Sequence, residues 1–147
     1  MSSHYGKLLI NLAISAVIMY LAMFSMIDGI SDFYNNVNML YMTLIMMAPM
    51  AVLMLLMMGS MYQNSKINLA LYIAFASLFI GAFAFTRAQT FVGNEQFLRS
   101  MIPHHSGAIL MCRESAITDP EIAALCGKII ESQRAEIEQM KGILSRY

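Results

Sequence analysis

Charged residues are nearly absent from the first 86 positions of this chain, and that gap limits its possible folds more than any other feature. Residues 87–147 hold seven Lys or Arg and seven Asp or Glu, whereas residues 1–86 hold only Lys7, Lys66, Asp28 and Asp32. With 59% hydrophobic and 12% charged residues, the composition is typical of a membrane protein. The sequence therefore predicts a membrane domain over residues 1–87 and a water-exposed domain over residues 94–147.

Three apolar stretches are each long enough to cross a bilayer as a helix. They cover about residues 8–27, 39–58 and 67–85, and about 20 residues at 1.5 Å rise span a hydrocarbon core of about 30 Å. Pro49 lies inside the second stretch, which membrane helices tolerate. A cleaved signal peptide is the alternative for the first stretch, but its apolar run is long and no clear cleavage site follows it.

The basic residues of the short loops predict the orientation. Lys7 and Lys66 flank the spans on one side, and the loop between the first two spans has no Lys or Arg. Basic loops stay in the cytoplasm, so three crossings place residues 87–147 outside it, although Arg87 just after the third span argues the other way. The expected location is a bacterial inner membrane, with the C-terminal domain in the periplasm.

The water-exposed domain has the pattern of two amphipathic helices. Apolar residues recur every three or four positions, and Thr118, Pro120 and Glu121 fit the end of one helix and a capping box at the start of the next. Two such helices joined by a short turn form an antiparallel hairpin. If the turn is centred near Asp119, facing residue numbers sum to about 238, which pairs Cys112 with Cys126, His105 with Gln133 and Leu98 with Met140.

A hairpin of fewer than 60 residues buries little surface by itself. The sequence therefore predicts that a second copy of the chain completes a four-helix bundle across a two-fold axis, as a homodimer or higher homo-oligomer.

Soft metal ligands concentrate in the first helix of this hairpin. Met101, His104, His105, Met111 and Cys112 lie within about three helical turns. Imidazole and thioether groups suit copper, and thioethers favour the cuprous ion. The alternative is that His105 is a core histidine bonded to Gln133 while His104 is a surface residue.

The two cysteines have three interpretations. Cys112 and Cys126 are buried small hydrophobes, a disulfide that joins the two helices, or thiolate metal ligands. Facing positions on packed helices can come within the distance of about 7 Å between Cα atoms that a disulfide needs.

The second apolar stretch carries a stripe of methionines, at positions 39, 42, 46, 50, 54, 57 and 61. Met19, Met23 and Met26 form a matching patch on the first stretch. Flexible packing explains such a stripe, and a cuprous ion path is the alternative. Packing is favoured, because Thr43 is the only polar side chain that this span offers to a path.

Other functional classes fit poorly. The chain has no net charge and no basic stripe, so nothing indicates nucleic-acid binding. A di-iron enzyme needs Glu-x-x-His pairs, which the sequence lacks, and His105 and Cys112 are about 10 Å apart along a helix, too far for a nucleophile and its base. We therefore expect a protein that is not an enzyme.

Residues 94–147 closely resemble the domain of unknown function 305 family. The run from Phe97 to Cys112, with its Met-Ile-Pro-His-His core, carries the resemblance together with the pattern from Pro120 to Met140. The resemblance implies a ferritin-like helical bundle, usually exported or membrane-tethered, with copper or silver bound in some members. The family's motif positions correspond here to Met101, His104, His105, Met111 and Met140.

Together these features predict a membrane-anchored protein that binds cuprous ions, with Ag⁺ as a surrogate, in metal homeostasis or resistance. The expected partners are the metal ion, the lipid bilayer and a second copy of the chain. The alternatives are a structural or oligomerisation protein without metal, and a methionine-lined component of copper transport. The expected metal ligands are Met101, His104, His105, Met111, Cys112, Cys126 and Met140.

Overall fold

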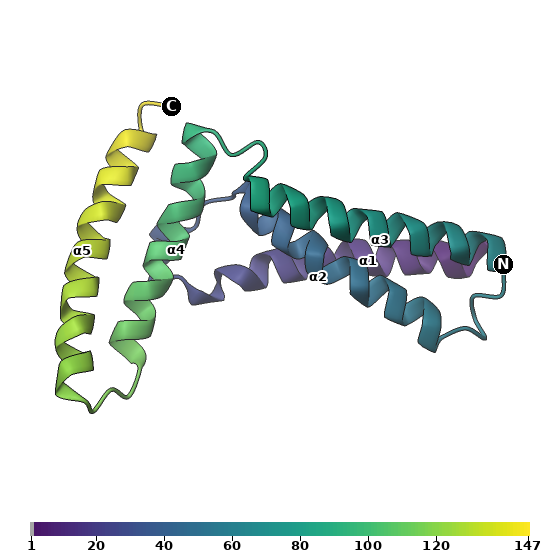
Figure 1. The fold of residues 1–147 in the computed structure, drawn as a ribbon, viewed down its shortest axis with the longest axis horizontal. Helices are drawn as coiled ribbons and strands as arrows, with labels where there is room; N and C mark the ends of the chain where they lie inside the picture. Colours follow the sequence, from purple (N-terminus) through teal and green to yellow (C-terminus); the bar gives the residue numbers. More distant parts are fainter. Residues whose placement is uncertain (1) are drawn as a thin grey trace. The chain divides into compact units, whose positions relative to one another are not determined.

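The computed structural model describes residues 2–147, with side chains from residue 4 onward, and all regular elements in this part of the chain are helical (Figure 1). The all-α prediction is therefore confirmed. Two short 3₁₀ helices, η1 (Met23–Met26) and η2 (Ile30–Asp32), separate the first two α-helices. The five α-helices are α1 (Ser2–Ala22), α2 (Val37–Met57), α3 (Ser65–Ala88), α4 (Asn94–Glu114) and α5 (Pro120–Leu144).

Three helical segments are long and apolar enough to cross a membrane. They cover His4–Met26, Val37–Met57 and Ser65–Ala88, so a long apolar helix lies at the approximate position of each predicted span. The third segment begins two residues before its predicted start, because the Asn64 side chain caps it by accepting hydrogen bonds from the amides of Lys66 and Ile67.

The chain forms two compact units. The three-helix unit contains Met1–Ala22 and Asn38–Thr90, and the α4–α5 unit contains Met23–Val37 and Phe91–Tyr147. The predicted boundary near residue 87 therefore misses one segment. Residues 23–37 connect the first two spans, yet they belong with the C-terminal helices.

The core of the three-helix unit is apolar and draws on all three helices. Buried side chains from α1 (Leu8, Leu12), α2 (Ala48, Ala51, Leu55) and α3 (Phe75) share one cluster with Tyr62 of the connecting turn. Most other apolar side chains of these helices face outward. An apolar exterior is what a helix needs in contact with lipid.

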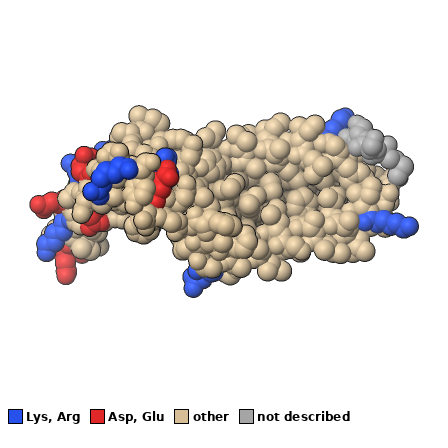
Figure 2. Space-filling model, turned by 90° about the horizontal axis from the view of Figure 1, so that it is seen from above, with Lys and Arg blue, Asp and Glu red and all other residues tan. Residues whose placement is uncertain are grey.

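The α4–α5 unit contains two helices that lie side by side (Figure 1). Leu98, Ile102, Ile109, Ile137 and Met140 form the buried cluster between them. Figure 2 shows Lys, Arg, Asp and Glu gathered on the surface of this unit. The unit therefore has one apolar interface and a charged exterior, as expected for a domain in water.

The start of α5 differs from the predicted capping box. Asp119 is the N-cap, and its side chain accepts from the amides of Glu121 and Ile122. Pro120 occupies the first helical position, and its fixed φ and missing amide hydrogen suit that position best. Asp119, the residue before Pro120, is therefore the N-cap. The N-cap lies one residue later in the sequence than the predicted Thr118.

Candidate functional site

His105 lies at the centre of the α4–α5 interface, with only 7% of its surface exposed. Both of its ring nitrogens have partners. Nδ1 lies 2.9 Å from the carbonyl oxygen of Met101, one turn earlier on α4, and Nε2 lies 2.7 Å from a carboxylate oxygen of Glu136 on α5. His105 therefore connects the two helices through a polar contact inside an apolar interface.

Each ring nitrogen of His105 faces an oxygen atom that accepts hydrogen bonds. A carbonyl oxygen only accepts, so Nδ1 carries a hydrogen and donates it to Met101. The Ser132 hydroxyl donates to Glu136 and, together with the contact to His105, holds the pKa of Glu136 below its ordinary value of 4.5. Glu136 is therefore ionised at neutral pH, and its carboxylate accepts hydrogen bonds.

Glu136, rather than the expected Gln133, is the residue opposite His105. Side chains on a helix lean toward its N-terminus. In an antiparallel pair the long His105 and Glu136 side chains lean in opposite directions, so they meet when their backbone positions are offset. The residue numbers of Cys112 and Cys126, which have short side chains, sum to the predicted 238. Those of His105 and Glu136 sum to 241.

Met101 and Met140 both lie at the α4–α5 interface, each one helical turn from a residue of this polar contact. Met101 precedes His105 by four residues, and Met140 follows Glu136 by four residues, so each shares a face with its neighbour. Met140 is in the buried cluster between the helices, and Met101 packs against that cluster. The structure thus gathers two thioethers, one imidazole and one carboxylate along the same interface.

Two of the expected ligands lie outside this group. His104 is exposed, and its ring centroid is 6.1 Å from that of His105. Met111 is 53% exposed and lies six residues along α4 from His105, about 9 Å along the axis.

Cys112 and Cys126 form a disulfide that joins α4 to α5, with their Cα atoms 5.2 Å apart. Of the three interpretations, the structure therefore contains the disulfide. In this oxidised form neither sulfur is a thiolate, so both cysteines are outside any ligand set.

The other residues of the Met-Ile-Pro-His-His-Ser-Gly run bind the segment 23–37. Pro103 has no amide hydrogen, which leaves the Arg99 carbonyl without its helical donor. The Asn36 side chain donates to that carbonyl at 3.5 Å. At Gly107 a Cβ atom would lie 3.3 Å from the Met26 carbonyl oxygen, so glycine permits this close approach.

Ser106 and Asp32 are the buried polar core of that contact. The Ser106 hydroxyl is fully buried, accepts from the Asp28 amide at 2.7 Å and donates to Asp32 at 2.6 Å. Lys141 of α5 binds the other oxygen of Asp32 at 2.6 Å. Burial lowers the pKa of Lys141, but the hydrogen bond and charge of Asp32 outweigh it, so the pKa lies above its ordinary value of 10.5.

Sequence reasoning placed Asp32 outside this unit and did not identify Glu136 or Lys141 as partners in its polar contacts. Asp28 and Asp32 are the only acidic residues among the first 86, and that rarity in an apolar region was a usable signal. Their partners are 74 to 109 residues away in the sequence, so no local pattern identifies them.

The donor set suits a soft metal ion better than a hard one. No group of three or more His, Cys, Asp or Glu side chains comes together in the part of the chain that the structure describes. His105, Met101 and Met140 share the α4–α5 interface, and an imidazole and two thioethers are ligand types that suit Cu⁺ or Ag⁺. Nδ1 of His105 is held by a backbone carbonyl, and this arrangement commonly orients a histidine whose Nε2 binds metal.

The methionines of α2 have mixed environments. Met47, Met50 and Met54 pack against the core of the three-helix unit, whereas Met42 and Met46 are 41% and 42% exposed. Several of these side chains therefore take part in ordinary helix packing.

The fold and the site define a helical protein with three potential membrane spans and a separate polar unit whose interface contains histidine and methionine. Residues 84–144 match the family model described as "Domain of unknown function (DUF305)". A curated relative, "Uncharacterized protein L153" of Acanthamoeba polyphaga mimivirus, is 35% identical over 119 residues, which cover 80% of this chain and 76% of the relative. No solved structure matches. This chain belongs to the domain of unknown function 305 family.

Proposed function

We propose that this protein is a membrane-anchored binding protein for cuprous ions, acting in metal homeostasis or resistance rather than as an enzyme. One observation carries the proposal. A buried histidine shares the α4–α5 interface with Met101, one turn earlier on α4, and with Met140 of α5, and its Nδ1 is already held by a backbone carbonyl.

The proposed ligands are Nε2 of His105 and the sulfur atoms of Met101 and Met140. Nε2 lies 2.7 Å from a carboxylate oxygen of Glu136. A metal ion binds the lone pair of Nε2, so metal binding displaces the contact with Glu136. The Glu136 carboxylate then faces the charge of the bound ion. His104, the remaining candidate imidazole, lies on the exposed side of α4.

We further propose that two copies associate to form a ferritin-like four-helix bundle. Four large apolar side chains of helices α4 and α5 are between 49% and 55% exposed: Phe97, Met111, Ile122 and Leu125. A second α4–α5 pair would cover such side chains and extend the small core.

We place the α4–α5 unit outside the cytoplasm, in the periplasm if the host is a bacterium. Two features support this side. The loop of residues 23–37, which has no Lys or Arg, belongs to the same unit, and α2 and α3 are the two spans between its segments. The Cys112–Cys126 disulfide suits an oxidising compartment.

Silver titration of the full chain in lipid nanodiscs tests the binding site. Ag⁺ needs no reductant, so the disulfide stays intact during the measurement. We expect saturable binding, and we expect the replacements His105→Gln, Met101→Leu and Met140→Leu each to weaken it by about tenfold or more. Unchanged affinity in all three variants would reject the proposed ligand set.

Met111→Leu is the matched control, since Met111 lies on the same helix but outside the interface. Its affinity should equal that of the unsubstituted chain. Thermal melts of all four variants distinguish loss of a ligand from loss of the fold.

A structural protein without metal is the alternative, and the His105–Glu136 contact is the observation that favours it. Both ring nitrogens have protein partners, so His105 can act purely as a link between helices. This alternative predicts no high-affinity binding of Ag⁺ or Cu⁺. A copper transport component is a further alternative. It predicts loss of copper flux when Met46, Met50 and Met54 are replaced by Leu.

A further inference from the structure

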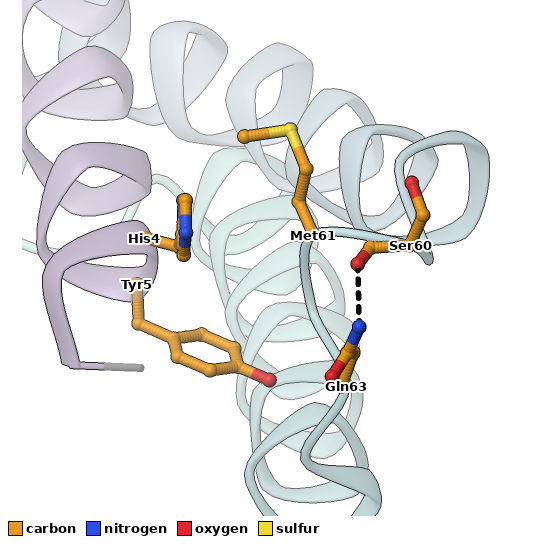
Figure 3. Close-up of a pocket in the computed structure, with 5 residues that line it drawn as sticks. All are labelled: His4, Tyr5, Ser60, Met61 and Gln63. Carbon is orange, nitrogen blue, oxygen red and sulfur yellow. Dashed lines mark hydrogen bonds between the residues drawn. The ribbon is translucent and has the colours of Figure 1, made fainter.

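The third histidine of the chain lines a pocket in the three-helix unit, far along the sequence from the motif on α4. The pocket has a volume of about 230 Å³ and is lined by His4, Tyr5, Ser60, Met61 and Gln63. Figure 3 shows His4 projecting from α1 toward the turn that carries Ser60 and Met61. The Met61 side chain extends back toward α1, so an imidazole and a thioether face the same pocket.

Tyr5 fixes the relative positions of α1 and the turn. Its hydroxyl accepts from the Asn64 amide at 3.2 Å and donates to the Asn68 side chain at 2.8 Å. Its ring packs on Tyr62, with 5.3 Å between ring centroids. His4 precedes Tyr5 directly, and Met61 precedes Tyr62 directly. The same contacts therefore hold the two donor residues on opposite walls of the pocket.

The lining residues select for a soft monovalent ion. No Asp or Glu is among them, so hard divalent ions such as Mg²⁺ and Ca²⁺ lack the carboxylates they prefer. Imidazole and thioether are neutral ligands that suit Cu⁺ and Ag⁺. The side-chain amide of Gln63 donates a hydrogen bond to the backbone carbonyl of Ser60 at 3.1 Å. This bond engages the Gln63 amide within the turn rather than with His4 or Met61.

We propose that His4 and Met61 form a second binding site for a soft monovalent metal ion, distinct from the α4–α5 interface. The site lies outside residues 84–144, the segment that matches the family model. The turn of residues 57–61 contributes two more thioethers nearby in sequence, Met57 and Met58, which are 84% and 38% exposed. The site needs no residue of α4 or α5.

Methionine methyl NMR of the full chain in nanodiscs tests this site, with Ag⁺ nitrate as the probe. The chain carries a methyl-¹³C label on its methionines, and Met61→Leu assigns the Met61 signal. We expect Ag⁺ to shift the Met61 signal, and we expect His4→Gln to weaken that response by about tenfold. Tyr5→Phe should also weaken the response of the Met61 signal to Ag⁺, because this variant loses the hydroxyl that connects α1 to Asn64 and Asn68.

Met42 provides the matched control, because it lies on α2 and is 41% exposed, as Met61 is. Its signal should not move at the Ag⁺ concentration that shifts Met61. A Met61 signal that does not respond to Ag⁺, or that responds equally in the His4→Gln variant, overturns the proposal. A shift caused by sodium phosphate instead of Ag⁺ also overturns it, since it identifies an anion site.

The triple variant His105→Gln, Met101→Leu, Met140→Leu separates the two sites. If the Met61 response survives in this variant, the second site stands whether or not the α4–α5 interface binds metal. If the response disappears there, Met61 does not report an independent site and the proposal fails.

Discussion

At the scale of single residues, His105 links the two helices of the α4–α5 unit and is the central ligand of the proposed metal site. Its Nδ1 bond to Met101 stays within α4, whereas its Nε2 bond to Glu136 joins α4 to α5. The first bond orients the ring, and the second occupies the nitrogen that a metal would need. Any ion at this position therefore competes with the Glu136 contact.

The pH dependence of Glu136→Gln tests this contact. Glutamine keeps hydrogen-bonding capacity but removes the charge. Because the fold lowers the pKa of Glu136 below 4.5, the carboxylate stabilises the fold above that pH, and the contribution is lost as pH falls through the folded-state pKa. We expect Glu136→Gln to lower the thermal midpoint at pH 7 and to have little effect at low pH.

Thermal melts of the full chain by circular dichroism measure the difference across pH. Glu131→Gln is the control, since Glu131 is an exposed carboxylate of the same helix. An equal effect of Glu136→Gln at all pH values would show that the charge of Glu136 does not contribute.

The sequence predicts the buried position of His105 and the pairing of the two cysteines, but not the partner of His105. Periodicity places His105 on the inner face of α4 and correctly pairs Cys112 with Cys126. Pairing by residue number gives the wrong partner for His105, because it considers only how far each residue lies along its helix. Long side chains also point toward the N-terminus of their own helix, which shifts the point of contact. Glu136 is exposed to solvent and also contacts His105, so its exposed position on α5 gives no local sign of that contact.

At the scale of elements, the segment 23–37 is as much a part of the α4–α5 unit as the helices are. Asp32 binds Ser106 of α4 and Lys141 of α5, so a single carboxylate contacts three segments of the chain. Helix patterns predict α4 and α5 from local sequence, whereas this contact joins residues far apart in the chain.

Asp32→Asn should destabilise the unit, because it leaves the Lys141 charge without its partner. Lys141 has a side chain that is only 24% exposed, and we expect a loss of about 2 kcal/mol. Glu138→Gln is a matched control on the same lysine: Glu138 lies 4.0 Å from Lys141 and is 79% exposed. Its replacement should cost less than about 0.5 kcal/mol. Urea unfolding curves compare the two, and equal losses would contradict the assigned role of Asp32.

The Cys112–Cys126 disulfide closes the connection between α4 and α5 with a sequence separation of 14 residues. Closing a loop of about 15 residues stabilises a fold by about 3 kcal/mol in the chain-entropy model. We therefore expect a reductant to lower the thermal midpoint of the unsubstituted chain. The Cys112→Ser, Cys126→Ser double variant should already melt at that lower temperature and should not respond to reductant. A response in the double variant would point to another cause.

At the scale of the whole molecule, the two units have opposite surface chemistry. The three-helix unit is apolar on its exterior, and the α4–α5 unit is charged (Figure 2). Segment 23–37 lies between the first two spans, yet it shares a unit with residues after the third span. If all three helices cross the membrane, both parts of the α4–α5 unit lie on the same side.

Single cysteines introduced into the Cys112→Ser, Cys126→Ser background test this topology. Ser31→Cys and Ser145→Cys should react with a membrane-impermeant maleimide from the extracytoplasmic side of intact cells. Ser60→Cys, in the turn between α2 and α3, should react only after the membrane is opened. Labelling of Ser31→Cys and Ser60→Cys from the same side would exclude three crossings.

The central claim is that a cuprous ion binds between α4 and α5 at His105. Anomalous scattering at the copper edge, from crystals of the full chain loaded with Cu⁺, tests it most directly. The account predicts a copper peak bonded to Nε2 of His105 and to the sulfur atoms of Met101 and Met140, with Glu136 displaced from the ring. A copper-loaded crystal in which His105 still contacts Glu136 and no peak lies beside it would contradict the claim.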